Sequence, residues 1–592
     1  MNTKYQNLKE LYEELTSNRS TYEPVWRDIA AYVGINLNID YSKNLSDKGD
    51  NLDTYVEDPT AALSVTQAGE YMQGVMWGTG DEALSIEPSD WVLQRAEESS
   101  LVKYFGFRTK QLLKNMNHSR AGLNTAMKSY FYDQTSFGTS GVGAFKNSDF
   151  LSRKEEHPYV FRSYGVDNMA IDEGKAGLVD VIFITYQWRV NRIYSEFWEV
   201  KDKLPKKIQE SYKNKKYNDE YTLVHAIYPR EDFDPKLKGK RGAKYRGSWF
   251  TLEDSDTVIF YEEDFRKLPI GVCRAIKIRG EVYGRSSGSL LISSIKSVNY
   301  MFGKTVEILE KMASPSLGIW NSALFGDSVL DTSADGLVTF NQSLMGNAQQ
   351  PVFPIHDVGD PTGIIQFLIP YLNEKIATGF KVDLLLDFSS AKDMTATESM
   401  QRYAIRGRSL SGLLQQQKIE MLEPLVDRCI QLEDDMGLRG VDPTNMAELA
   451  RQAMEAGNSD VIIPDVVLAA MEKGKQWYKI KFNNELERLS RTEAVQRVLQ
   501  SVNALLMIGS AFPSIVEAVD WYKIWSDVNT YLGTTYATSE KEFKMKMQKQ
   551  MEIQQQMLQT QQLQAGAEAG KNISEGRKNA AEAESINSGS ST

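Results

Sequence analysis

The fold is decided by one stretch, residues 280–315, which reads GEVYGRSSGSLLISSIKSVNYMFGKTVEILEKMASP. Large apolar side chains recur in it at steps of three, four and seven residues: Leu291, Ile295, Val298, Phe302, Leu309 and Met312. This spacing places them along one face of a helix, which we predict over residues 289–313, ending before Pro315. One helix alone cannot bury such a stripe, so the pattern also predicts a partner helix.

The turn before this helix resembles the nucleophile elbow of serine hydrolases. Gly284, Ser286 and Gly288 fit the G-x-S-x-G pattern, with a strand-like run before them and a helix after. A triad also needs an acid and then a histidine later in the chain, and the one downstream histidine, His356, falls in an irregular segment. A serine hydrolase using Ser286 is therefore an alternative to a turn that caps the following helix.

Two further glycine patterns match nucleotide-binding loops in part. Residues 303–305, Gly-Lys-Thr, resemble the end of a phosphate loop, but Val298 stands where its first glycine belongs. The tripeptide also falls inside the predicted helix, where its amides are already bonded. The other pattern consists of Gly138, Gly141 and Gly143. Its glycines are in the wrong order for a dinucleotide-binding fingerprint, so we interpret this segment as a loop.

The chain beyond Pro315 alternates irregular and helical segments. Residues 314–361 lack helical periodicity and hold short strand-like pieces among Gly, Asp and Pro. A second helix is predicted over residues 362–386, where three apolar residues share one face: Leu372, Ile376 and Phe380. A polar loop, residues 387–394, follows it.

A long helix is predicted over residues 395–433. Thr395 and Glu398 have the spacing of a capping box, in which each side chain satisfies a free backbone amide. Pro424 falls inside this helix, removes one backbone hydrogen bond and clashes with the preceding turn, so we expect a kink near Glu420.

The two ends of the chain differ in texture. Residues 1–288 carry helical stripes first and then β-branched and aromatic runs at 181–186, 223–228 and 258–261, an α+β pattern. Residues 434–540 are predicted to be helical. Residues 541–592 begin with a thin apolar stripe among glutamines. After Ala565 we expect disorder, unless a ring of subunits orders the segment.

The composition excludes several classes of protein. The 592 residues are enough for several domains, and the net charge of −11 argues against a basic nucleic-acid coat. Two cysteines exclude a disulfide scaffold, and four scattered histidines offer no metal site, so we expect no metal and no cofactor. We expect no membrane-spanning helix and no secretory signal. Two lysine-rich runs, 201–216 and 236–246, are interpreted as solvated faces, with phosphate contact as the alternative.

Six motifs, in order along residues 1–430, resemble the head-to-tail connector, or portal, proteins of short-tailed, podovirus-like tailed phages. The motifs are Arg19, Tyr22, Glu23, Pro24, Trp26, Arg27, Ile29, Ala30 and Tyr32; residues 58–61; 224–230; 280–288; 394–398; and Glu420, Leu422, Pro424, Leu425, Val426 and Arg428. The ordered set is more specific than any single motif. Beyond residue 430 the likeness is limited to a helical and then Gln-rich texture.

The resemblance implies a protein that is α+β, mainly α, and forms a ring of about twelve copies around an axial channel at one capsid vertex. Its implied parts are a wing (1–288), a first stem helix (289–313), a clip (314–361), a second stem helix (362–386), a tunnel loop (387–394), a long kinked wing helix (395–433), a helical crown (434–540) and a Gln-rich helix or barrel with a flexible tail (541–592). It would be a structural component of the virion, assembled in the host cytoplasm, and not an enzyme.

The resemblance also implies partners. Double-stranded DNA would pass through the channel without sequence-specific contacts, and four residues of the tunnel loop would face it: Ser389, Ser390, Lys392 and Asp393. Protein partners would be the terminase large subunit, a tail adaptor or head-completion protein, and the major capsid and scaffolding proteins. Besides the hydrolase, an assembly scaffold without a channel stays an alternative.

Overall fold

The computed structural model divides the chain into two compact units. Residues 1–96 and 100–487 form the first unit, and residues 97–99 and 488–592 form the second. The structure describes residues 2–33, 56–78, 83–95, 98–147, 150, 156–234, 240–252, 259–320, 336–340, 352–354, 362–382, 412, 414–483, 495, 497–505, 507, 521–532, short pieces between 545 and 560, and 571–581.

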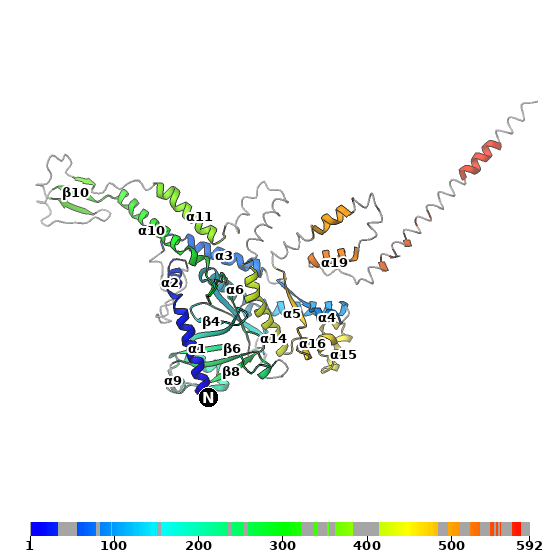
Figure 1. The fold of residues 1–592 in the computed structure, drawn as a ribbon, viewed down its shortest axis with the longest axis horizontal. Coiled ribbons are helices and arrows are strands. Elements are labelled where there is room, and N and C mark those ends of the chain that lie inside the picture. Colours follow the sequence, from blue (N-terminus) through cyan, green and yellow to red (C-terminus); the bar gives the residue numbers. More distant parts are fainter. Residues whose placement is uncertain are drawn as a thin grey trace, which may run out of the picture. The chain divides into compact units, whose positions relative to one another are not determined.

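A five-stranded antiparallel sheet, with its strands in chain order, forms the centre of the first unit (Figure 1). Its strands are β4 Met169–Glu173, β5 Val179–Arg189, β6 Glu220–Pro229, β7 Tyr245–Thr251 and β8 Tyr261–Phe265. The strands expected at 181–186 and 223–228 are confirmed as parts of β5 and β6. The expectation at 258–261 is wrong, because β8 begins at Tyr261, and β7 was missed in a stretch read as a basic run.

Both faces of this sheet are covered, which explains why β5 and β6 read as continuous apolar runs. Helix α1, Asn2–Ser20, covers one face with Leu8, Tyr12 and Leu15. The other face packs into a core that also includes α2, Glu23–Tyr32. Burial of both faces removes the need for polar residues at alternate positions.

A second sheet lies beside this core, with strand order β3-β2-β9. Its strands are β2 Thr139–Lys146, β3 Tyr159–Tyr164 and β9 Ile270–Arg274, and it packs against α6 Leu123–Phe137, which contacts α3 Thr60–Met76. The loop interpretation of the glycines is wrong for two of them. Gly141 and Gly143 lie inside β2, where a Cβ would come within 3.2 Å of the Ile270 side chain.

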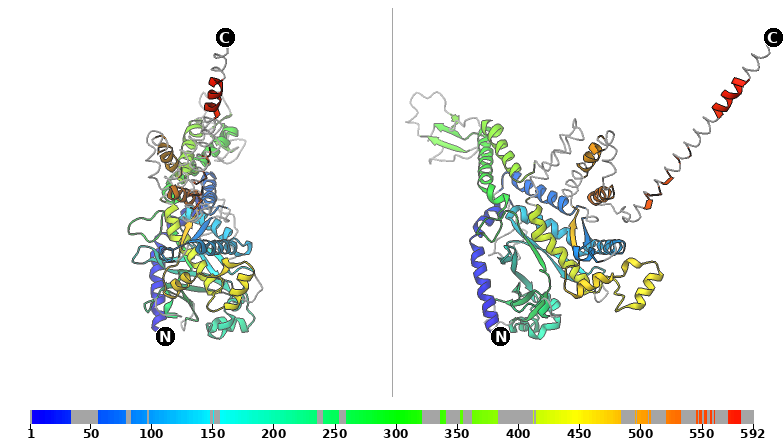
Figure 2. Two further views of the ribbon diagram at one scale, coloured as in Figure 1. Left: turned by 90° about the vertical axis from the view of Figure 1, so that its right-hand side faces the viewer. Right: turned by 45° about the vertical axis from the view of Figure 1, so that its right-hand side comes forward.

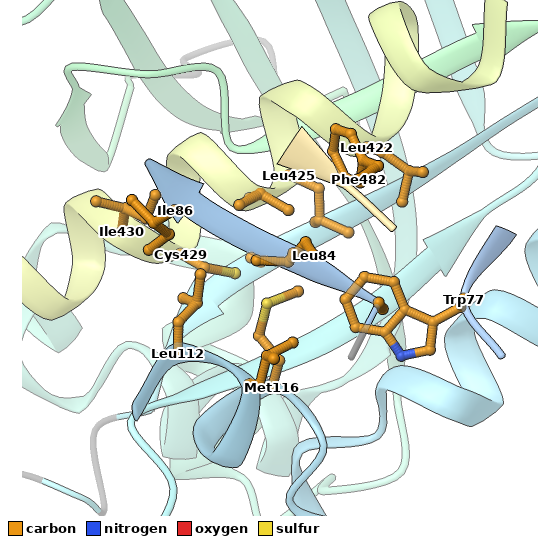
Figure 3. Packing of buried hydrophobic residues seen from close by; sticks show 14 of the residues in the cluster. Trp77, Leu84, Ile86, Leu112, Met116, Leu422, Leu425, Cys429, Ile430 and Phe482 are labelled. Atoms are coloured by element: carbon orange, nitrogen blue, oxygen red, sulfur yellow. The ribbon is translucent and has the colours of Figure 1, made fainter. Parts of the chain in front are cut away.

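The largest core joins distant parts of the chain (Figure 3). Strand β1, Leu84–Pro88, pairs antiparallel with β13, Tyr478–Phe482, beside α14, Glu423–Asp435. Helices α5 Glu98–Met116, α4 Asp90–Leu93, α15 Ala447–Glu455 and α16 Asp465–Glu472 complete this region. The expectation that residues 434–540 are helical throughout is therefore wrong at β13. Residues up to 487 cluster with the first unit.

The second unit is described in pieces. Helix α19 spans Trp521–Leu532, and residues 571–581 are helical and exposed. The expectation of disorder after Ala565 stays untested. None of the described helices combines the length and apolar character that a bilayer crossing needs. The two cysteines are free buried thiols.

Candidate assembly site on the helical arm

An arm built around α10 and α11 extends from the rest of the first unit (Figure 2). It consists of α10 Ser287–Ala313, the strands β10 Leu317–Trp320, β11 Leu337–Phe340 and β12 Val352–Pro354, the π-helical turn η6 Ile364–Leu368, and α11 Ile369–Gly379. The strands form one small sheet, in which β10 is parallel to β11 and antiparallel to β12. The helix expected over 289–313 is confirmed as α10, and short strands are confirmed within 314–361.

The arm begins at a capped turn, which resolves the elbow motif. Ser286 is fully buried; its Oγ donates to the Ser136 carbonyl oxygen at 2.6 Å and accepts from the Ser289 amide at 2.9 Å. The Ser289 side chain accepts from the Ser286 amide in return, which completes a capping box. Both functions of the Ser286 hydroxyl are therefore used by the backbone, so the structure favours the helix cap over the nucleophile.

The glycines of the same turn allow two backbones to touch. Gly138, at φ +86°, ends α6, and a Cβ on Gly284 would lie 2.6 Å from the Gly138 carbonyl oxygen. A Cβ on Gly288 would lie 2.8 Å from the Ser136 carbonyl oxygen. The spacing G-x-S-x-G thus serves close packing at the base of α10.

A polar joint ties the base of the arm to α3. The Asn299 side-chain oxygen accepts from the Glu57 amide at 2.6 Å and from the Asp58 amide at 3.1 Å. The Asn373 side-chain amide donates to Asp58 Oδ2 at 3.0 Å, while Asp58 Oδ1 accepts from the Thr60 amide at 2.8 Å. Both helices of the arm therefore form hydrogen bonds with the segment that leads into α3. Sequence reasoning missed both asparagines, although polar residues on two helices predicted to pair were a usable signal.

The predicted seam is buried in its inner half. Leu291, Ile295 and Val298 pack in one core with two α11 residues, Leu372 and Ile376, and with Phe380, which directly follows α11. The prediction that α10 pairs with the next helix is confirmed. The expected end of that helix at 386 is wrong: Gly379, pressed against Leu291, is its last residue, and Lys381 turns the chain at φ +62°.

The outer half of the seam is exposed. Phe302, which follows the buried residues on the same face of α10, is 37% exposed, and Leu309 is 45% exposed. Exposed apolar residues continue along α10 and onto η6 and α11: Val306, Met312, Ile364, Ile365, Phe367, Leu368 and Tyr371. We call this set, with Phe302 and Leu309, the outer stripe. An exposed apolar surface of this kind is typical of a protein interface.

The Gly-Lys-Thr tripeptide has structural roles within α10. Gly303 leaves space for the Glu57 carboxylate, and the Thr305 hydroxyl donates to the Met301 carbonyl oxygen at 2.7 Å. Lys304 pairs with Glu307, which also pairs with Lys311 at 3.1 Å. The amides of the tripeptide belong to the helix, so a phosphate loop is excluded here.

Comparison with known proteins identifies the family. The family model described as bacteriophage head to tail connecting protein matches residues 5–441. This chain belongs to that family. A probable portal protein of Bordetella phage BPP-1 is 22% identical over 422 residues, which cover 71% of this chain and 72% of that protein. The resemblance to head-to-tail connectors is thereby confirmed.

The solved structures that match in part come from gene transfer agent (GTA) particles. A chain in the neck of an empty GTA particle is 13% identical, covers 75% of this chain and 90% of its own length, and has a TM-score of 0.29. A chain in the virion of a native gene transfer agent particle is 14% identical, covers 72% of this chain and 95% of its own length, and has a TM-score of 0.27.

Two prolines of the connector coincide with π-helical turns. Pro424 follows η8, Lys418–Leu422, where the Glu423 amide donates to the Lys418 carbonyl oxygen five residues back. The same arrangement precedes Pro370 in η6. The kink expected near Glu420 stays a prediction; the structure has a π-turn at that position. The π-turn at Pro370 was not predicted.

A buried ion pair holds η8 in place. The Glu420 carboxylate accepts from the Arg274 amide at 2.9 Å and pairs with the Arg274 guanidinium, and Arg274 also pairs with Glu173. Arg274 is fully buried and Glu420 nearly so. The long helix is therefore fixed to β9 and to the end of β4 at the π-turn.

The predicted channel residues lie outside the described part of the chain. This applies to the tunnel loop 387–394, with Ser389, Ser390, Lys392 and Asp393, and to the predicted cap at Thr395 and Glu398. Among the described residues, no group of three His, Cys, Asp or Glu side chains could hold a metal ion.

A second buried charge cluster links α14 to α5. The Arg108 guanidinium, fully buried, lies 3.2 Å from Glu433 and 3.0 Å from Asp434. Burial raises the pKa of Glu433 to about 7, against the opposing effect of Arg108. Burial likewise raises the pKa of Asp434 to about 6. One arginine thus balances two carboxyls that hold protons more tightly than in water.

Proposed function

We propose that this connector is a viral portal subunit. About twelve copies would form a ring at one capsid vertex, and double-stranded DNA would pass through it during packaging and ejection. The observation that carries this proposal is the outer stripe, which continues the buried seam along α10 beyond the residues that α11 covers. A second copy of the same chain supplies a complementary apolar face without any further protein.

The arm has the build of a portal stem and clip. Helices α10 and α11 would be the stem helices, and the sheet β10–β12 would be the core of the clip, where the terminase large subunit and later the tail adaptor or head-completion protein dock. The first unit without the arm would be the wing, and the helices of the C-terminal region the crown, with the Gln-rich segment as a barrel. The major capsid and scaffolding proteins would surround the ring.

DNA contact in the channel is assigned to the tunnel loop. Lys392 is its one cation, flanked by Asp387 and Asp393, so a ring would offer phosphate a circle of lysines tempered by carboxylates. Such contacts carry no sequence information. The protein would be a virion component, assembled in the host cytoplasm, with no enzymatic activity and no cofactor.

Native mass spectrometry and negative-stain microscopy of the purified protein test the proposal. A closed ring of about twelve copies is expected. A monomer with esterase activity that is lost in Ser286→Ala would support the hydrolase instead. An open fibre would support an assembly scaffold without a channel, because a heterologous interface that does not close generates filaments.

A further inference from the structure

A lysine-rich insertion lies between β5 and β6, separate from the arm. It comprises α8 Val190–Glu196, η3 Trp198–Lys203 and α9 Lys206–Lys213, followed by a turn into β6 (Figure 1). Its apolar side packs on the ends of β5 to β8 in a core that includes Trp188, Phe197 and Trp249. The insertion is thus a rigid platform, and the lysine run 201–216 lies on its outer side.

Four lysines of α9 and the turn after it are exposed and form no ion pair within the described residues: Lys206, Lys213, Lys215 and Lys216. Some exposed lysines elsewhere in the first unit form ion pairs; Lys128, for example, lies 2.9 Å from Glu70. Others form none within the described residues, such as Lys103, Lys110 and Lys175, but they lie far apart in the sequence. The second run is partly neutralised, because Arg246 lies 3.8 Å from Asp264. The insertion therefore differs from the rest of the first unit in spacing, because four exposed lysines without an ion pair fall within residues 206–216.

Local helix electrostatics does not explain this concentration. A cation near the C-terminal end of a helix is stabilised by the helix dipole, which accounts for Lys213. Lys206 occupies the first turn of the same helix, where the dipole disfavours a cation. Lys215 takes the left-handed conformation, φ +59°, at a position where glycine is the favoured residue. The sequence thus places cations at two positions that destabilise the helix or its end.

The aromatic rings of the insertion already contact other side chains of the protein. Tyr194 and Tyr212 stack with ring centroids 3.7 Å apart, and the Lys201 ammonium lies 4.2 Å over the Trp198 ring. Stacking on unpaired bases, the usual mode of single-strand binding, is therefore not available at these faces. The four lysines offer point charges and no planar fork for reading base edges.

We infer that this insertion binds the phosphate backbone of double-stranded DNA without sequence preference. Lys206 and Lys213 are seven residues apart on one face of α9, or about 10 Å along the helix axis. That separation spans roughly three phosphates of one strand. This contact goes beyond the proposed channel, since it uses neither the arm nor the tunnel loop and needs no ring.

The test is a titration of a short, blunt-ended, fluorescently labelled DNA duplex with the full-length protein. Binding is measured by fluorescence anisotropy at several salt concentrations. In the triple variant Lys206→Gln, Lys213→Gln, Lys216→Gln, the slope of log K against log salt should be smaller by about 2.7, at roughly 0.9 per lysine. Affinity at the lowest salt should fall at least tenfold. Lys215→Gly should weaken DNA binding while raising the melting temperature, because glycine relieves the left-handed backbone.

The matched control removes three other exposed lysines, Lys103, Lys110 and Lys175, by substitution with Gln. It should retain the wild-type slope. An unchanged slope in the first triple variant, or an equal loss in the control, would overturn the inference. So would binding of a polyglutamate peptide to the insertion with no binding of the duplex. DNA binding by a protein that forms no ring would support the inference and contradict the proposed portal function.

Discussion

The outer stripe predicts that assembly and folding can be separated by one substitution, Leu309→Asp. Leu309 leaves 45% of its surface exposed in the protomer, and its neighbours Val306 and Met312 on the same face are exposed as well. The substitution leaves the buried seam at Ile295 and Val298 intact. It should therefore change contacts between copies of the chain and not the packing within one copy.

The magnitude follows from the exposed surface. At roughly 25 cal/mol per Å², covering the exposed part of one leucine contributes about 2 kcal/mol to each interface. Burying an unpaired carboxylate in its place adds a penalty of about 2 kcal/mol or more. The sum of about 4 kcal/mol corresponds to roughly a thousandfold weaker contact between neighbouring copies. In the isolated protomer, the change of an exposed helix residue should cost no more than about 0.5 kcal/mol.

The assay is native mass spectrometry together with thermal unfolding. Leu309→Asp should yield monomers with the melting behaviour of unassembled wild-type protein. The control is Leu449→Asp, which changes a leucine that is 50% exposed on helix α15, outside the arm. It should retain the wild-type oligomer. Rings of full size with Leu309→Asp, or equal loss of rings with the control, would refute the assignment of the outer stripe as the interface between copies.

Three further predictions concern charged groups. Lys392→Ala should leave rings intact and change DNA retention in particles in a salt-dependent way, because it removes the one cation of the tunnel loop. The pKa of Glu433 is raised to about 7, so the native state binds this proton more tightly than the unfolded chain does. The free energy of unfolding should therefore fall as the pH rises from about 4.5 to 7. In urea titrations, Glu433→Gln should flatten this dependence on pH. Glu420→Ala should cost about 3–5 kcal/mol in thermal unfolding, because the guanidinium of Arg274 loses its main buried partner; a change below about 1 kcal/mol would contradict that role.

Helical periodicity was the part of the sequence that predicted structure most closely. The stripe from Leu291 to Met312 predicted α10 with its start within two residues, since a long amphipathic pattern leaves few alternatives. The end of α11 was misplaced because it depends on tertiary contact: Gly379 meets Leu291, and Lys381 adopts a left-handed turn. Neither contact is visible in the local pattern.

Strand β13 shows a different failure. Tyr478, Ile480 and Phe482 alternate with lysines, which is the pattern of a half-buried strand. The run is five residues long and stands among helices, and its partner β1 lies almost 400 positions earlier in the sequence. A short strand is stabilised by its partner, and a pairing at that separation leaves no local trace.

The sequence predicted the buried inner half of the candidate assembly site and did not predict its exposed outer half. The buried inner seam follows from spacing alone, whereas exposure of Phe302 depends on the length of α11 and on where η6 begins. The joint at Asn299 also depends on a distant segment, the start of α3. Sequence periodicity therefore identified the face of α10 that needs a partner, and the structure separates the part covered by α11 from the part that is exposed.

The two π-turns show how a proline inside a helix can be accommodated without ending it. A proline lacks the amide that would bond four residues back, and its ring clashes with that carbonyl group. At Pro424 the carbonyl in question belongs to Glu420, inside η8, where the bonding shifts to five residues and the helix continues as α14. At Pro370 the same shift occurs in η6, and α11 continues. A proline that follows four or more helix-forming residues in an otherwise unbroken apolar pattern therefore predicts a π-turn just before it. A side chain in that turn can contact residues outside its own helix, as Glu420 does when its carboxylate accepts from the Arg274 amide.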